Sequence, residues 1–292
     1  MVGPCPAQGE SAARARRLPS DAGRAALRRA ERPARPVDGQ TCLKWMKAAA
    51  MAAAFVFVPS LGGKGALAEV LPQLTEARYD APTRHYPHAV LGDDVEYSAL
   101  VLRDSVGTRY RVELPADGPV FEDLQPRLWD VTGDGRAEVV VVESHPTRGA
   151  RLVVYGLTQT GLREIAATPN IGTRFRWLAP IGAADMDGDG HVEIAYIDRP
   201  HLARLLRVWR YSAGELTEVA QTSGLTNHRI GEDFITSGLR DCGDGVEIIT
   251  LNPGWNRIIA TRLVSDGLQS RDLGVFRADL GLGDVLSCTD PQ

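Results

Sequence analysis

Residues 185–193 read Asp-Met-Asp-Gly-Asp-Gly-His-Val-Glu, and residues 130–138 read Asp-Val-Thr-Gly-Asp-Gly-Arg-Ala-Glu. Each stretch places oxygen-bearing side chains at positions 1, 3, 5 and 9 around two glycines. Carboxylates this close repel one another unless a cation neutralises them, and Ca²⁺ accepts about six to eight oxygen ligands from a flexible loop. The two stretches therefore predict calcium-binding turns, and calcium is the expected cofactor.

The residues after each turn exclude an EF-hand. That motif needs a bidentate Glu at position 12, but position 12 is Val141 in one stretch and Tyr196 in the other. Residues 139–142 and 194–197 are instead short β-branched or aromatic runs, which are typical of strands. The turns are therefore expected to connect β-strands.

The turns recur at a nearly fixed spacing. Asp130 and Asp185 are 55 residues apart, and a shorter version begins 56 residues later, where residues 241–247 read Asp-Cys-Gly-Asp-Gly-Val-Glu. A fixed long period indicates a structural repeat. The third version lacks two residues and one carboxylate, so we expect it to keep the turn and to lose the metal.

These turns and the strands around them resemble FG-GAP or VCBS repeats, the blades of integrin-alpha-like β-propellers, over about residues 79–290. The resemblance implies that each metal turn joins the first two strands of a blade, and that position 7 contributes only a main-chain carbonyl. Thr132 replaces a carboxylate, so the tighter site is expected at residues 185–193. The implied ligands are Asp185, Asp187, Asp189, His191 and Glu193 in one turn and Asp130, Thr132, Asp134, Arg136 and Glu138 in the other.

The expected fold is all-β, a β-propeller of four four-stranded blades with calcium-binding turns. The clearest unit has strands at residues 175–184, 192–197, 204–211 and 216–221. The same division gives blades at residues 79–119, 120–168, 169–224 and 225–275. The first blade has only three strands, and we expect residues 276–288 to supply its fourth and close the ring. A five-bladed ring is the alternative.

The amino-terminal residues predict export. Residues 1–45 are rich in Arg, Ala and Pro without apolar periodicity, and we interpret them as a mis-assigned start or a disordered segment. Residues 46–68 have the basic start, apolar run and Ala-x-Ala end of a signal peptide. Residues 69–292 are then a single propeller domain in the periplasm or outside the cell, with no membrane span after cleavage. The alternatives are a membrane anchor and a basic nucleic-acid-binding arm.

Charge and composition exclude several functions. Residues 1–68 hold 11 of the 33 basic and 4 of the 37 acidic side chains, so residues 69–292 keep 22 and 33, a net charge of −11. They contain no lysine, which excludes Schiff-base and P-loop chemistry. An acidic domain is also not expected to bind nucleic acid. Its two cysteines, Cys242 and Cys288, are expected to form a disulfide in an exported protein, with two buried thiols as the alternative.

Loops at the end of the blades opposite the metal turns are unexpectedly rich in Arg and His. Loops on a rigid scaffold often bind ligands, and Arg donates in pairs to carboxylate or phosphate groups. The alternative is that these side chains pair with neighbouring acids such as Asp198. The candidate ligand-binding residues are His145, Arg148, Arg174, Arg199, His201, Asn227, His228, Arg229 and Trp255.

We interpret the chain as a non-catalytic binding or interaction module for a protein, a glycan or an anionic small ligand. An enzyme that uses His201 and His228 near Asp233 is the alternative, because a His with a carboxylate is the minimum for acid–base catalysis. The sequence contains no G-x-S-x-G, H-E-x-x-H or G-x-G-x-x-G motif before a helix. A purely structural or assembly role is the third possibility.

Overall fold

The computed structural model describes residues 71–290, which lie within one compact unit, Gly65–Gln292. The predicted upstream segment and signal peptide, residues 1–68, lie outside the described residues. The described part contains sixteen strands and one four-residue helix, so the all-β prediction is confirmed. None of the described helices is long and apolar enough to cross a membrane.

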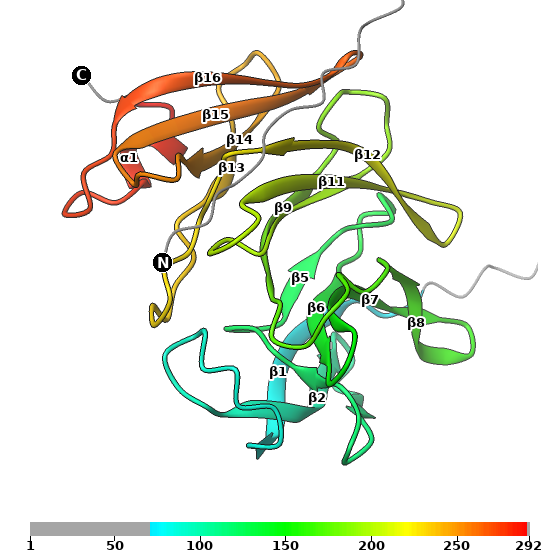
Figure 1. Cartoon of the computed structure of the whole chain (residues 1–292). Helices are drawn as coiled ribbons and strands as arrows, with labels where there is room; N and C mark the ends of the chain where they lie inside the picture. Colours follow the sequence, from blue (N-terminus) through cyan, green and yellow to red (C-terminus); the bar gives the residue numbers. More distant parts are fainter. Residues whose placement is uncertain (1–70, 291–292) are drawn as a thin grey trace, which may run out of the picture. The chain divides into compact units, whose positions relative to one another are not determined.

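The strands form three antiparallel sheets (Figure 1). The first contains β1 (Leu74–Thr83), β2 (Glu96–Asp104), β3 (Arg109–Glu113), β4 (Val120–Phe121), β5 (Arg127–Trp129), β6 (Glu138–His145), β7 (Gly149–Thr158) and β8 (Gly161–Ala167). The second contains β9 (Leu178–Ala184), β10 (Glu193–Asp198), β11 (Leu205–Ser212) and β12 (Glu215–Ser223). The third contains β13 (Gly238–Asp241), β14 (Val246–Leu251), β15 (Arg257–Val264) and β16 (Gly267–Val275).

Two of the predicted blades are separate four-stranded sheets, β9–β12 and β13–β16, with boundaries close to those expected from the sequence. The first two predicted blades differ, because β4 pairs with both β2 and β6 and joins them into one eight-stranded sheet. Strand β4 contains only two residues, which is too short for a sequence pattern to identify. Its pairs are Tyr97↔Phe121, Val120↔Ser144 and Phe121↔Glu143.

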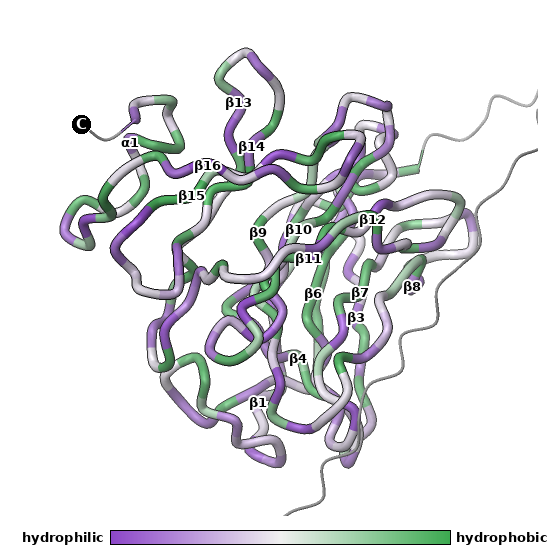
Figure 2. Tube along the Cα trace, turned by 45° about the horizontal axis from the view of Figure 1, so that its top comes forward, coloured by the Kyte–Doolittle hydropathy of each residue, from purple (hydrophilic) through white to green (hydrophobic). Residues whose placement is uncertain are grey.

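The middle strands of the sheets are buried on both faces, which explains their continuous apolar runs. Val139 and Val141 of β6 face a cluster with β1, β2 and β4, whereas Val140 and Val142 face a cluster with β9 and β10. The same alternation places residues 194 and 196 of β10 in one core and residues 195 and 197 in the next. Figure 2 shows hydrophobic residues along β6, β9 and β10. Each sheet therefore packs on the next through alternate side chains.

The prediction that residues 276–288 add a strand to the first blade is wrong. This segment forms turns and the short helix α1 (Gly283–Leu286), and it covers the last sheet. Leu286 lies so close to Gly238 of β13 that a Cβ atom there would be 2.8 Å from the Leu286 side chain. Phe276, Leu282 and Val285 complete this apolar cluster. The segment therefore caps the end of the repeat array.

Candidate metal turns and loop surface

The second turn, residues 185–193, connects β9 and β10 and is organised by its own main chain. Asp185 accepts hydrogen bonds from the N–H groups of Gly188 (2.8 Å), Asp189 (3.1 Å) and Gly190 (2.9 Å). Gly188 and Gly190 have φ of 80° and 87°, a left-handed backbone that favours glycine. Glu193 is buried and accepts from the N–H of Met186 at 2.8 Å. The glycines thus let the chain curl around the carboxylate at position 1.

The carboxylates of the second turn converge closely enough to hold a cation. One oxygen each from Asp185, Asp187 and Glu193 lies within 4.8 Å of the others. Oxygens bound to one Ca²⁺ lie about 2.3–2.6 Å from it, so ligands on opposite sides are separated by about 5 Å. Burial raises the pKa of Glu193, and main-chain donation by His191 lowers that of Asp189. An all-oxygen donor set of this size and charge fits calcium.

The first turn, residues 130–138, connects β5 and β6 and repeats this arrangement. Asp130 accepts from the N–H groups of residues 133, 134 and 135, at 2.8, 3.2 and 2.8 Å. Glu138 accepts from the N–H groups of Val131 (2.8 Å) and Thr132 (3.0 Å). Asp134 pairs with Arg136 at 2.5 Å. The main chain of the first turn thus holds Asp130 and Glu138 as that of the second holds Asp185 and Glu193, but among the described residues only Asp185, Asp187 and Glu193 converge as a possible metal group.

An arginine that the sequence did not single out lies in the second turn. The Arg210 guanidinium donates to Glu193 at 2.6 Å and to Asp187 at 2.5 Å, and it pairs with Asp189 at 2.7 Å. These hydrogen bonds raise the pKa of Arg210. The ligand spacing along the chain carries no signal for this residue, because Arg210 reaches the turn through strand pairing.

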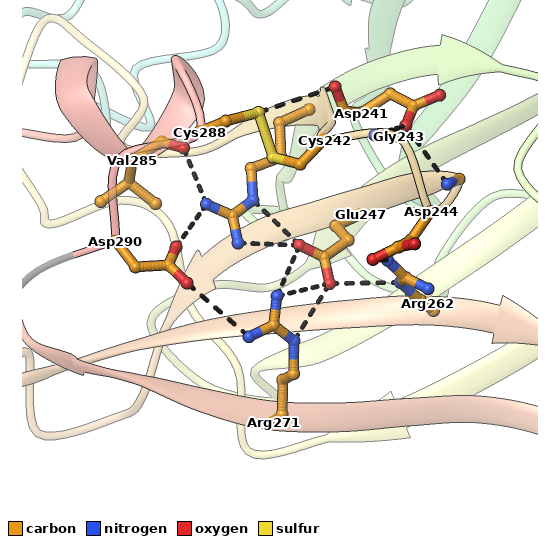
Figure 3. Close-up of polar contacts among 12 residues, drawn as sticks. Asp241, Cys242, Gly243, Asp244, Glu247, Arg262, Arg271, Val285, Cys288 and Asp290 are labelled. Atoms are coloured by element: carbon orange, nitrogen blue, oxygen red, sulfur yellow. Dashed lines mark hydrogen bonds and ion pairs between the residues drawn. A yellow bond between two sulfur atoms is a disulfide. The ribbon is translucent and has the colours of Figure 1, made fainter.

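The third turn, residues 241–247, keeps the curl, since Asp241 accepts from the N–H groups of Gly243 (2.8 Å) and Gly245 (3.2 Å). Arginines surround its last carboxylate, Glu247 (Figure 3). Burial acts to raise the pKa of Glu247, but hydrogen bonds from Arg271 and Arg240 outweigh it and the pKa is lowered. The guanidinium groups thus neutralise this turn within the protein.

The two cysteines of the described chain form a disulfide. Cys242 and Cys288 are joined across a sequence separation of 46, with a Cα–Cα distance of 5.6 Å. The bond ties the capping segment to the third turn. Arg240 adds to this attachment, because its guanidinium donates to the Val285 carbonyl at 2.9 Å and to Asp290 at 2.6 Å.

The predicted ligand-binding residues lie on loops at the ends of the strands away from the turns, and contacts link these loops. Gly172 donates to the Arg148 carbonyl at 2.9 Å, and Phe175 donates from its main chain to the Tyr86 hydroxyl at 2.8 Å. Gly231 donates to the Val90 carbonyl at 3.1 Å. Residues 84–92 therefore contact loops on both sides. We call the loops 84–92, 145–149, 169–176, 199–204, 226–237 and 252–256 the loop surface.

The side chains of His201 and His228 are in contact, but their partners are other groups of the protein, as in a structural pair of histidines. His201 Nε2 lies 3.0 Å from His228 Nδ1, and His228 Nε2 lies 2.9 Å from the Glu232 carbonyl. His201 stacks on the buried Trp177. Burial lowers the pKa of His201 to about 4, helped by the neighbouring His228 and His88. Both ring nitrogens of His228 are thus engaged by the protein itself.

The remaining loop residues differ in how many contacts their side chains make within the protein and in how exposed they are. Arg199 pairs with the buried Asp198 at 2.7 Å, and Asn227 is buried with its amide 3.3 Å from the Ala179 carbonyl. His145 bonds within its own loop to Thr147. Arg148, Arg174 and Arg229 are exposed, and Trp255 is half-buried. The structure therefore separates the structural members of the predicted set from the accessible ones.

Comparison with known proteins supports the repeat. Residues 130–196, which span the first and second turns, match the family of FG-GAP-like repeats. The search of curated proteins gave no match. Among solved structures, the chain is similar to the crystal structure of a protein from Lactobacillus plantarum, a target of the Northeast Structural Genomics Consortium, with a TM-score of 0.34 and 14% identity over 61% of this chain. The similar region spans about half, 54%, of that protein.

Proposed function

We propose that the protein is an exported β-propeller-type module, stabilised by calcium at its first and second turns, that binds an anionic ligand on the loop surface without catalysing a reaction. The FG-GAP-like repeat and the all-β fold support the type of module. The convergence of Asp185, Asp187 and Glu193 supports the calcium site.

The arrangement of Arg174 carries the ligand proposal. Its guanidinium carbon lies over the Phe175 ring, 4.3 Å from the ring centre, and 5.6 Å from the centre of the Tyr86 ring. Among the described residues, this guanidinium forms no hydrogen bond or ion pair with the protein, and only the Arg174 carbonyl is engaged, by the Thr173 hydroxyl at 3.3 Å. A stacked guanidinium keeps its N–H groups directed outward in the ring plane, where they can donate in pairs to a carboxylate, sulfate or phosphate.

Arg229 presents a second stacked guanidinium on the loop surface. Its guanidinium carbon lies 4.0 Å from the centre of the Trp255 ring, and one of its nitrogens forms a long ion pair with Glu232 at 3.5 Å. Arg199 is not included in the proposed site, because it donates two hydrogen bonds, at 2.7 and 3.0 Å, to both oxygens of the buried Asp198. Two arginines fixed on aromatic rings lose less side-chain entropy on binding than free ones do. This favours recognition of an anion on a domain whose net charge is negative.

The proposal is tested with a panel of acidic glycans and acidic or phosphorylated peptides, each paired with a neutral counterpart. We expect selective binding of acidic members that weakens as salt rises, because exposed charges are screened. Arg174→Ala combined with Arg229→Ala should abolish this binding with almost no change in thermal stability, since exposed arginines contribute little to folding.

The matched control is Arg109→Ala combined with Arg163→Ala, which removes the same charge from the outer strands β3 and β8. This control should bind as the wild type does. Equal loss in both double variants would show a general effect of net charge. Equal binding of acidic and neutral members by the wild type would contradict the proposed ligand class.

A further inference from the structure

The position opposite the last carboxylate of each turn differs among the three repeats. In the β10–β11 ladder Glu193 pairs with Arg210. The β14–β15 register pairs Ile248 with Thr261, so Glu247 is opposite Arg262, whose Nε donates to it at 3.2 Å. The β6–β7 register pairs Val139 with Tyr155, which places Glu138 opposite Gly156. The series is thus glycine, arginine and arginine within three copies of one motif.

In the second turn, Arg210 uses the oxygens that the turn's own main chain leaves free. Glu193 accepts from Met186 at Oε2 and from Arg210 at Oε1. Asp189 accepts from the main chain of His191 at Oδ1 and faces Arg210 with Oδ2. Asp187 likewise gives Oδ2 to Arg210. One guanidinium therefore engages three of the four predicted side-chain ligands.

In the third turn, more arginines bind the last carboxylate than in the second turn. Oε1 of Glu247 accepts from Arg262 and Arg271, and Oε2 accepts from Arg240 and Arg271. The side chain of Arg240 is only 2% exposed, so this pairing is part of the folded core. Both oxygens at the ninth-position equivalent are thereby committed to arginine.

Within residues 71–290, the first turn receives no such cation from the neighbouring strand. A Cβ atom added at Gly156 would lie 3.4 Å from Glu138 Cγ and 3.0 Å from Ile165, so the residue opposite Glu138 has no side chain to contact it. In the same described part of the chain, Oε1 of Glu138 has only the Thr132 hydroxyl as a hydrogen-bond partner, at 3.3 Å. The acids of this turn remain available to an external cation apart from the Arg136 contact to Asp134.

We propose that Arg210 is an internal cation that competes with calcium for the second turn, and that the residue opposite the last carboxylate sets how strongly each turn binds metal. This inference rests on the proposed calcium sites. The second turn has one carboxylate more than the first, which favours calcium binding, and the positive charge of Arg210 offsets this gain in calcium affinity. It also keeps that turn ordered at low calcium, because a like-charged cluster without a counter-ion is destabilising.

The test titrates calcium alone into the exported, disulfide-bonded protein by isothermal titration calorimetry and measures thermal melts with and without chelator. Arg210→Met keeps the length and apolar stem of the side chain and removes its charge. We expect this variant to bind calcium at the second turn about tenfold more tightly than the wild type. Its melting temperature should fall in chelator and recover with calcium, so calcium stabilises it more than the wild type.

Arg207→Met is the matched control, because Arg207 lies on the same strand and pairs with Asp198 and Glu218, away from the turn. Its calcium affinity should equal that of the wild type. Unchanged or weaker calcium binding by Arg210→Met, with normal binding by the wild type, would overturn the role of Arg210 and leave the calcium sites standing. No calcium binding by either protein would overturn both.

Discussion

Arg210 lies directly across the β10–β11 ladder from Glu193, and its Nε donates to the buried Glu193 carboxylate at 2.6 Å. This pair connects the turn to the body of the sheet. It means that the charge of the second turn is partly balanced by the protein, so calcium is expected to adjust the stability of the fold and not to be essential for folding.

Asp187→Asn should weaken calcium binding at the second turn without abolishing it, because an amide oxygen stays at the position that Thr132 fills in the first turn. The effect on the metal-free protein should be small, because Arg210 keeps Asp189 and Glu193 as partners. In addition, Asp187 accepts one main-chain hydrogen bond, at 3.3 Å, whereas Asp185 accepts three. For dissociation constants of about 10⁻⁴–10⁻³ M, 1 mM calcium stabilises the fold by about 0.4–1.4 kcal/mol per site. Thermal melts with and without chelator should show that the calcium-dependent shift is reduced in the variant.

Asp266→Asn is the control for this change, since Asp266 is an exposed acid in the β15–β16 hairpin. It should keep the full calcium response. A variant at Asp187 that responds to calcium as the wild type does would show that the second turn is not a metal site.

Glu247→Gln should destabilise the protein strongly in a calcium-independent way. The change leaves the buried Arg240 with only the exposed Asp290 as a charged partner, and removing one member of a buried ion pair costs about 3–5 kcal/mol. Denaturant unfolding would measure the loss. Glu218→Gln, which breaks a more exposed pair with Arg207, should cost about 1 kcal/mol or less. Equal costs would mean that the arginine cluster does not hold the third turn.

Loss of the disulfide should loosen the capping segment. For a sequence separation of 46, the chain-entropy relation gives a stabilisation of about 4 kcal/mol. Replacing both cysteines by serine should lower stability by up to this amount and speed amide hydrogen exchange first in residues 276–290. Two alkylatable thiols in the native purified protein would contradict the bond, and intact mass of the same sample would test the proposed cleavage after Ala68.

The sequence was sufficient to predict the repeated part of the fold. The spacing of Asp130, Asp185 and Asp241 located three equivalent turns, and the short β-branched and aromatic runs after them placed strands of the second and third sheets within a few residues. These features are local, because each depends on residues close together in the chain. The structure bears out the all-β prediction on this basis. It also contains the predicted disulfide, which was expected for a different reason, the presence of two cysteines in an exported protein.

The features that the sequence missed depend on residues distant in the chain. Arg210 reaches Asp187 only because β10 and β11 pair in one register, and Arg240 reaches Asp290 only because residues 276–290 fold back on β13. The pairing of Arg199 with its neighbour Asp198 differs from these cases, because it was the alternative that the sequence offered for this arginine. Ligand spacing alone therefore predicted tighter calcium binding at the second turn than at the first, because it took no account of Arg210 as an internal counter-ion.

Stability should fall as pH rises from neutral to about 9, owing to Glu96. Burial raises the pKa of this carboxyl to about 9, with Glu122, Asp93 and Asp123 adding to the shift. Between about pH 4.5 and pH 9 the folded state keeps the Glu96 proton, whereas the unfolded state has lost it. The contribution of this proton to folding stability is therefore full below about pH 4.5 and is lost as pH rises through 9. The depressed pKa of His201 acts in the opposite direction only below about 6.5.

The window from pH 7 to 9 isolates this effect. The wild type should lose up to about 1.4 kcal/mol per pH unit in urea unfolding experiments. Glu96→Gln, which mimics the protonated carboxyl, should show a much flatter profile over the same window. Parallel profiles for the two proteins would show that Glu96 is ionised in the fold.

Equilibrium dialysis of the purified protein against radioactive calcium tests the central claim most directly, because it counts bound ions without relying on stability. The account predicts two sites with dissociation constants of about 10⁻⁴–10⁻³ M, one of them weakened in Asp187→Asn and none contributed by residues 241–247. Absence of bound calcium at millimolar concentration, or two sites of unchanged affinity in Asp187→Asn, would contradict it.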